Sequence, residues 1–99
     1  MFQGRINFPT RLKGVFWSRN LKDLDVNKDK DYIIHQLLMY GSLEDIKWLS
    51  SIYSDENIKK IFVNNPKKIY TQASFNFIKN YLLRISDRLN EFDYVKSVY

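Results

Sequence analysis

Apolar residues recur at alternating steps of three and four in the last third of the chain. The residues that form this repeat are Phe75, Ile78, Leu82, Ile85, Leu89 and Phe92. No Gly or Pro follows Pro66, so nothing in the sequence interrupts a helix over this stretch. A period of 3.5 residues keeps one apolar edge of a helix facing another helix. The spacing therefore predicts one long helix over residues 71–99 that docks through its apolar stripe.

The partner of this stripe can belong to the same domain or to another molecule. Apolar stripes on helices usually form the core of their own domain, and the polar Lys96 falls at a seam position here. In the alternative, the six stripe residues bind a protein partner, either a different protein or a second copy in a homodimer. Arg88 and Asp93 have the spacing that pairs opposite charges across a parallel two-helix seam.

The rest of the chain predicts an all-α fold, a small bundle of four to five helices within a single domain, 1–99. Residues 1–26 form an irregular N-terminal arm, residues 27–66 a three-helix unit, and residues 71–99 the long C-terminal helix. No stretch shows the alternation typical of a half-buried strand. We expect both tryptophans, Trp17 and Trp48, to be buried, because each lies among apolar neighbours.

Polar residues and one glycine mark the expected helix boundaries. Asn27 is placed to cap the first helix, and Gly41 to end it. Ser42 and Asp45 have the spacing of a short capping box for the second helix. Ser54 or Asp55 caps the third helix, which ends before Pro66, and a fourth begins near Thr71.

Composition removes several classes of function. The chain has no Cys, which excludes disulfides, thiol catalysis and thiolate metal sites, and fits a cytoplasmic protein. Residues 1–20 carry scattered Arg and Lys and no unbroken apolar block, so we expect no signal peptide and no membrane association.

Catalytic and metal sites are not predicted. His35 is the only histidine, and it lies in an apolar helix without a nucleophile partner, so we expect a packed side chain. The alternating acids that begin at Asp23 resemble a calcium loop, but Lys28 and Ile34 stand where such a loop needs Gly and Glu. We therefore expect no enzyme activity and no cofactor or metal.

Charge is segregated along the chain, whose formal net charge is +5. Residues 1–22 hold five basic residues and no acid, residues 23–58 hold eight acids against three lysines, and residues 59–88 hold seven basic residues against one acid. Such blocks can attract nucleic acid, although exposed charge is often only a solvated surface. The residues best placed to contact a nucleic-acid backbone are Lys59, Lys60, Lys67, Lys68, Lys79 and Arg84.

The second and third expected helices are joined by a short polar break, as in a helix-turn-helix. The second helix of that motif enters the major groove with its N-terminal residues, which here include Asp55 and Glu56. Two leading acids suit the helix dipole and oppose phosphate, so helix capping explains them equally well.

The chain resembles an uncharacterised family of small bacterial proteins with the pattern LFW, IIxxxLxYG and xLEDxxWL. The matching residues lie roughly within 12–78: Val15-Phe16-Trp17, Ile33-Ile34, Leu38-Met39-Tyr40-Gly41, Leu43-Glu44-Asp45, Trp48-Leu49, Tyr53, Ile58, Thr71 and Phe75. The family usually has Asp where Ser18 stands and Arg within the stretch 34–37. Members are often encoded beside nucleotidyltransferase-like toxins of the abortive-infection type, so the resemblance implies an antitoxin or toxin-partner role.

Together these features predict a non-enzymatic, protein-binding module, the antitoxin-like half of a toxin-antitoxin system, whose partner is a nucleotidyltransferase-type toxin. The alternative is a helix-turn-helix, DNA-binding transcriptional regulator. The two roles are compatible, because an antitoxin can repress its own operon. The sequence leaves open which partner or operator is bound, and whether the C-terminal helix packs in its own chain or in another.

Overall fold

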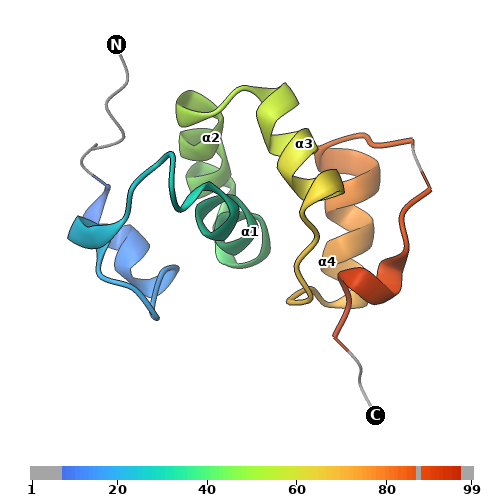
Figure 1. Cartoon of the computed structure of the whole chain (residues 1–99), viewed down its shortest axis with the longest axis horizontal. Helices are drawn as coiled ribbons and strands as arrows, with labels where there is room; N and C mark the ends of the chain where they lie inside the picture. Colours follow the sequence, from blue (N-terminus) through green and yellow to red (C-terminus); the bar gives the residue numbers. More distant parts are fainter. Residues whose placement is uncertain (1–7, 87, 97–99) are drawn as a thin grey trace. The chain divides into compact units, whose positions relative to one another are not determined.

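The computed structural model describes residues 8–86 and 88–96, and over these residues it is all-α with no strand (Figure 1). The α-helices are α1 (Lys30–Tyr40), α2 (Leu43–Ile52), α3 (Asp55–Asn64) and α4 (Gln72–Phe77). Shorter helical turns are η1 (Thr10–Gly14), η2 (Leu21–Asp23), η3 (Ile78–Leu82), which is a π-helical turn, and η4 (Glu91–Asp93). The predicted fold class, a small all-α bundle, is confirmed.

The chain divides into two compact units, unit 1 (Met1–Leu49) and unit 2 (Ser50–Tyr99). Unit 1 contains η1, η2 and α1, and unit 2 contains α3, α4, η3 and η4. Helix α2 begins in unit 1 and ends in unit 2. The organisation of residues 1–99 as a single domain stays a prediction.

The first helix starts later than the sequence indicates. Asn27 lies before α1, and Asp29 is the residue that precedes it. The carboxylate of Asp25 accepts hydrogen bonds from the backbone N–H groups of Asn27 and Lys28, at 2.8 and 3.0 Å, which holds a turn there instead. Such local side-chain hydrogen bonds compete with helix formation. Gly41 ends α1 as predicted.

The caps of the next three helices are confirmed. The Ser42 N–H donates to the carboxylate of Asp45 at 3.0 Å, and the Asp45 N–H donates to the Ser42 hydroxyl at 3.2 Å, which is the reciprocal pattern of a capping box. The Ser54 hydroxyl caps α3, and the Thr71 hydroxyl caps α4. Each side chain satisfies an N–H that a helix leaves unpaired at its start.

Aliphatic side chains dominate the buried part of unit 1. Six consecutive residues of α1, Ile33–Leu38, are buried, so this helix is enclosed all round. They include His35, which is a packed side chain as expected, and Gln36, whose amide donates to the Val15 carbonyl at 2.8 Å. That bond satisfies a buried polar group and fastens the N-terminal arm to α1.

An aromatic cluster forms the core of unit 2. The ring of Tyr94 lies 4.8 Å from that of Phe62 and 4.9 Å from that of Phe75, and the ring of Tyr70 lies 5.6 Å from that of Phe62. The Tyr94 hydroxyl donates to the Phe62 carbonyl at 2.6 Å. Burial raises the pKa of both tyrosines, and the neighbouring Tyr94 adds to the effect at Tyr70.

The long C-terminal helix is not present: the helical segment that begins with α4 ends at Leu82. Arg84 adopts a left-handed backbone with φ of 52°, and the N–H of Ile85 donates to the Lys79 carbonyl at 2.8 Å. This reversal is the kind of helix ending that usually uses glycine. It turns Leu83 and Ile85 inward, where both are buried. Residues 87 and 97–99 of the predicted helix lie outside the described residues.

After this reversal the chain returns to the start of α4. The Tyr70 N–H donates to the Tyr94 carbonyl, and the Lys96 N–H donates to the Tyr70 carbonyl, both at 2.9 Å. These bonds form an isolated parallel bridge between Tyr70 and Val95. The returning segment places Tyr94 in the aromatic cluster. A continuous helix would carry Tyr94 away from this cluster.

Candidate interaction surfaces

The six residues predicted to bind a partner do not share one helical face, because the helix ends within the stripe. Three of them, Phe75, Ile78 and Ile85, are buried. Leu82 and Leu89 are half-buried, and Phe92 is 76% exposed. The buried members contribute to the core of unit 2, as in the alternative in which the stripe packs within its own domain.

The six predicted nucleic-acid-binding residues all lie in unit 2. Lys59 and Lys60 are exposed on α3, Lys67 and Lys68 lie between α3 and α4, and the other two are Lys79 and Arg84. Lys67 and Lys79 are half-buried, and the Lys79 ammonium donates to the Ile85 carbonyl at 3.1 Å. The remaining four make no ion pair with any residue in 8–86 or 88–96.

The expectation that Trp17 is buried is wrong, because its side chain is 60% exposed. Its ring meets that of Tyr40, which is 37% exposed, edge to face at 4.6 Å. Trp48 is half-buried, and its ring lies 5.4 Å from that of Phe8. Trp17 lies in a segment without a regular apolar period, so its apolar neighbours were the only indication that it is buried. Val15 and Phe16 are indeed buried, but the Trp17 side chain points outward.

The backbone around Trp17 is held from both sides. Phe16 is fully buried, with its ring 5.6 Å from that of Tyr32. Ser18, which stands where the resembled family usually has Asp, has its hydroxyl 2.9 Å from that of Tyr32. The indole is therefore presented from a fixed segment and packs against Tyr40 at the end of α1. We refer to Trp17 and Tyr40 as the aromatic pair of unit 1.

A polar anchor joins the N-terminal arm to the start of α2. The guanidinium of Arg11 donates from Nε to the Asp45 carboxylate at 2.8 Å, and Glu44 lies farther away, at 4.0 Å. Burial alone would raise the pKa of Asp45, but the hydrogen bonds from Ser42 and Arg11 and the charge of Arg11 hold it below its ordinary value. The sequence indicated the capping role of Asp45 and gave no sign of the partner 34 residues away.

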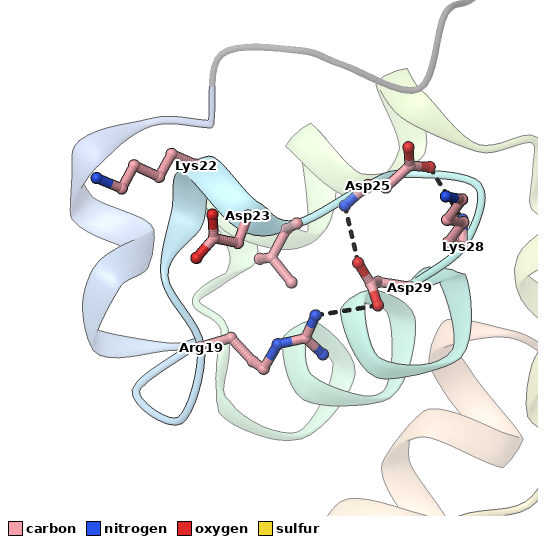
Figure 2. A pocket seen from close by; sticks show the side chains of 7 residues that line it. Arg19, Lys22, Asp23, Asp25, Lys28 and Asp29 are labelled. Carbon is pink, nitrogen blue, oxygen red and sulfur yellow. Dashed lines mark hydrogen bonds and ion pairs between the residues drawn. The ribbon is translucent and has the colours of Figure 1, made fainter.

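A charged pocket of about 640 Å³ lies before α1 (Figure 2). Its walls carry both signs of charge, and Arg19 donates to the Asp29 carboxylate at 3.1 Å. The other oxygen of Asp29 accepts from the Asp25 N–H at 2.9 Å, so this carboxylate closes the turn that leads into α1. Among the charges that line the pocket, Arg19 and Asp29 pair with each other and hold this turn, so we regard the pocket as part of the fold. Its lining residues are Arg19, Lys22, Asp23, Leu24, Asp25, Lys28 and Asp29.

Two other features to consider are a metal centre and a membrane-spanning helix. Over the described ranges, no three His, Asp or Glu side chains gather as they would around a metal ion. No helix within residues 8–86 or 88–96 combines the length and apolarity that crossing a bilayer requires.

A comparison with known proteins matches this chain to one protein family. A search of curated proteins and a search of solved structures each found no match. The model of the family of unknown function DUF6922 matches residues 12–62, from η1 to the last turn of α3. The match contains the aromatic pair of unit 1 and the Ser42–Asp45 capping box, whereas Thr71 and Phe75 lie beyond it. The chain therefore belongs to DUF6922, a family of unknown function.

Proposed function

We propose that the chain is a non-enzymatic protein-binding module that engages its partner through the aromatic pair of unit 1. The observation that carries this proposal is a tryptophan that is 60% exposed and already packed against Tyr40. Trp and Tyr dominate the binding energy of protein interfaces because they bury a large area in few rotamers. A large exposed aromatic surface on a small domain is the usual mark of such an interface.

The surroundings of the aromatic pair suit a binding surface. Gln36 donates to the Val15 carbonyl, and the Tyr32 hydroxyl contacts the Ser18 hydroxyl, so the residues on both sides of Trp17 are held before a partner binds. Lys13 is exposed in the same segment and can place a positive charge at the rim of such a surface. A rim of this charge favours an acidic face on the partner.

The identity of the partner is proposed from the family resemblance described above. It implies an antitoxin-like role, with a nucleotidyltransferase-type toxin as the protein bound. Of the predicted C-terminal stripe, Phe92 is the exposed member, and it is not part of the contact proposed here. In this proposal the aromatic pair replaces the stripe as the principal contact, and the buried stripe residues support unit 2.

Co-purification with the product of the adjacent reading frame tests the proposal. The tagged full-length chain is expressed with that protein, and Trp17→Ala and Tyr40→Ala are compared with the unchanged chain. We expect each substitution to weaken the complex by more than about 2 kcal/mol, as for an interface hot spot.

Phe92→Ala is the matched control, because Phe92 is an exposed aromatic of unit 2. It should bind as well as the unchanged chain. The proposal fails if the complex survives Trp17→Ala and Tyr40→Ala together, or if the adjacent protein does not bind the unchanged chain. Circular dichroism of each variant separates lost binding from lost folding.

A second candidate is double-stranded DNA, in which α3 serves as the recognition helix of a helix-turn-helix regulator. The observation in its favour is that Lys59 and Lys60 are exposed on α3 without an ion pair to any described residue. Against it, the first turn of α3 presents Asp55 and Glu56, both exposed, where the motif reads bases. A mobility shift with the upstream region of its own gene, at two salt concentrations, tests this candidate.

A further inference from the structure

The outward face of the α4–η3 segment carries two exposed aromatic rings. Phe77 is 47% exposed and Tyr81 is 72% exposed, and their rings are stacked with centroids 6.1 Å apart. Phe75 and Ile78 are the residues of this segment that point into the core. Phe77 and Tyr81 are four positions apart, so they lie on one side of the helical segment, away from that core.

Uncharged amides and one cation accompany these rings. Asn76 and Asn80 are exposed, and each directly precedes one of the two aromatic residues. Arg84 follows Tyr81 by three residues and is also exposed. Its left-handed backbone ends the helical segment, so Arg84 does not continue the helix.

The charged residues of the segment that carries this face all have one sign. Residues 59–86 contain six basic residues and no acid. Arg84 makes no ion pair with a described residue, and the ammonium of Lys79 lies 3.1 Å from the Ile85 carbonyl, at the end of the helical segment. An ammonium there offsets the negative end of the helix dipole, which would otherwise repel an anion.

We propose that unit 2 binds single-stranded nucleic acid, with bases stacked on Phe77 and Tyr81 and a phosphate bound by Arg84. Flat exposed rings within a cationic surface are the two parts that such binding requires, since every base has a face to stack and every linkage has a negative charge. The side-chain amides of Asn76 and Asn80 can donate hydrogen bonds to the edges of the stacked bases and accept hydrogen bonds from them.

Other occupants fit the same face less well. In a duplex the bases are stacked on one another, so exposed rings gain nothing from it unless the strands separate. A second copy of the chain would bring a second block of positive charge against the first. An acidic protein would satisfy the cations and is kept as an outcome of the test. The proposal does not depend on the protein-binding function, which uses residues of unit 1.

Fluorescence anisotropy of labelled oligonucleotides, with the full-length chain, tests the proposal. The probes are oligothymidylate, oligouridylate and a mixed-sequence duplex, each of about 20 nucleotides, a length that exceeds the site of a small domain. We expect both single strands to bind more tightly than the duplex. A preference between the DNA and RNA strands would show whether a 2′-hydroxyl is recognised.

Substitutions of the two rings are the decisive variants. Phe77→Ala and Tyr81→Ala should each lower the affinity for the single strands by about 5- to 150-fold, as expected for the loss of one stacked base. Phe92→Ala is the matched control, because Phe92 is also an exposed aromatic residue of unit 2 but lies between Glu91 and Asp93. It should leave the affinity unchanged.

Arg84→Gly removes the phosphate contact without threatening the fold, because glycine accepts the left-handed backbone at this position. The slope of log affinity against log salt should fall by about 0.7, the value for one contact to a single strand. Lys47→Gln, which removes one exposed positive charge from unit 1, should leave the slope unchanged.

Several results would overturn the proposal. They are duplex binding as tight as single-strand binding, no binding at about 50 mM salt where such contacts are strong, or equal losses in Phe77→Ala, Tyr81→Ala and Phe92→Ala. A Phe77→Ala, Tyr81→Ala double variant that binds oligonucleotides normally but loses the adjacent reading frame's product would instead assign this face to a protein.

Discussion

Unit 1 and unit 2 contain eight basic residues each, and they use them in different ways. In unit 1, Arg11 pairs with Asp45, and Arg19 pairs with Asp29. Both pairs join the N-terminal arm to a helix start. In unit 2, Lys59, Lys60, Lys68 and Arg84 make no ion pair with an acid in the described part of the chain. The same residue types therefore fasten one unit together and form an open surface on the other.

The buried interiors differ in a matching way. Unit 1 buries aliphatic side chains around α1 and needs polar bonds to hold its irregular arm, such as the one from Gln36 to Val15. Unit 2 holds its irregular C-terminal segment through the rings around Tyr94 and a single bridge at Tyr70. An irregular segment can therefore be held by ion pairs or by aromatic packing, and in unit 2 the second solution leaves Lys59, Lys60, Lys68 and Arg84 without an ion pair to a described acid.

Removing the central ring of unit 2 should have the largest effect on stability. Tyr94→Ala deletes a buried ring that contacts Phe62, Phe75 and Tyr70, and frees the Phe62 carbonyl. We expect the free energy of unfolding to fall by about 3 to 5 kcal/mol, measured by urea denaturation. Tyr94→Phe, which keeps the ring, should cost about 1 to 2 kcal/mol. If both variants cost the same, packing does not hold this segment.

The polar anchor of unit 1 should give a smaller effect that depends on pH. Asp45→Asn removes the charge opposite Arg11 and should cost about 1 to 2 kcal/mol at neutral pH. Glu44→Gln is the control, because Glu44 is exposed and 4.0 Å from Arg11, and it should cost less than about 0.5 kcal/mol. An equal cost for both variants would show that general charge, not the anchor, matters.

The pH dependence has a definite sign. The pKa of Asp45 is lowered in the folded state, so its contribution is complete above the ordinary carboxyl pKa and is lost as the pH falls through the lowered value. The difference in unfolding free energy between the unchanged chain and Asp45→Asn should therefore shrink below about pH 4. A difference that stays constant down to pH 2 would contradict the ionised anchor.

The exposed aromatic pair should contribute little to folding. Trp17→Ala loses an edge-to-face contact with Tyr40 and little burial, so we expect a cost of at most about 1 kcal/mol. Trp48→Ala, which removes a half-buried ring packed on Phe8, should cost about 2 kcal/mol or more. Thermal denaturation compares the two, and the reverse order would return Trp17 to the core.

The caps of α2, α3 and α4 and the end of α1 were predictable from the sequence because they depend on neighbouring residues. Ser42 with Asp45, Ser54 and Thr71 each act within three residues, and Gly41 ends α1 where a side chain would approach the Leu37 carbonyl to 2.6 Å. The exposed aromatic pair was not predictable, since only long-range packing decides which of three successive apolar residues faces outward.

The end of the last helix was not predictable for a related reason. The apolar repeat continues to Phe92. Such a repeat indicates which residues are buried, but it does not indicate whether they all belong to one continuous helix. Leu83 and Ile85 are buried because the chain reverses its direction at Arg84. Tyr94, which follows this reversal, packs into the aromatic cluster. The residue at the reversal is an arginine, which gives no signal for a left-handed turn.

That arginine supplies the smallest of the expected effects. At φ of 52° the Cβ of Arg84 crowds its own backbone, a strain of about 1 to 2 kcal/mol that glycine avoids. Glycine in turn makes the unfolded chain more flexible, which offsets about 0.5 to 1 kcal/mol. Arg84→Gly should therefore raise the free energy of unfolding by about 0.5 kcal/mol, which urea denaturation can resolve against Arg84→Ala, a variant that keeps the strain. An equal change in the free energy of unfolding for Arg84→Gly and Arg84→Ala would show that charge, not backbone strain, sets stability at this position. A stabilised Arg84→Gly that also binds single strands less tightly would show that unit 2 keeps a strained cation there at a cost to its own fold.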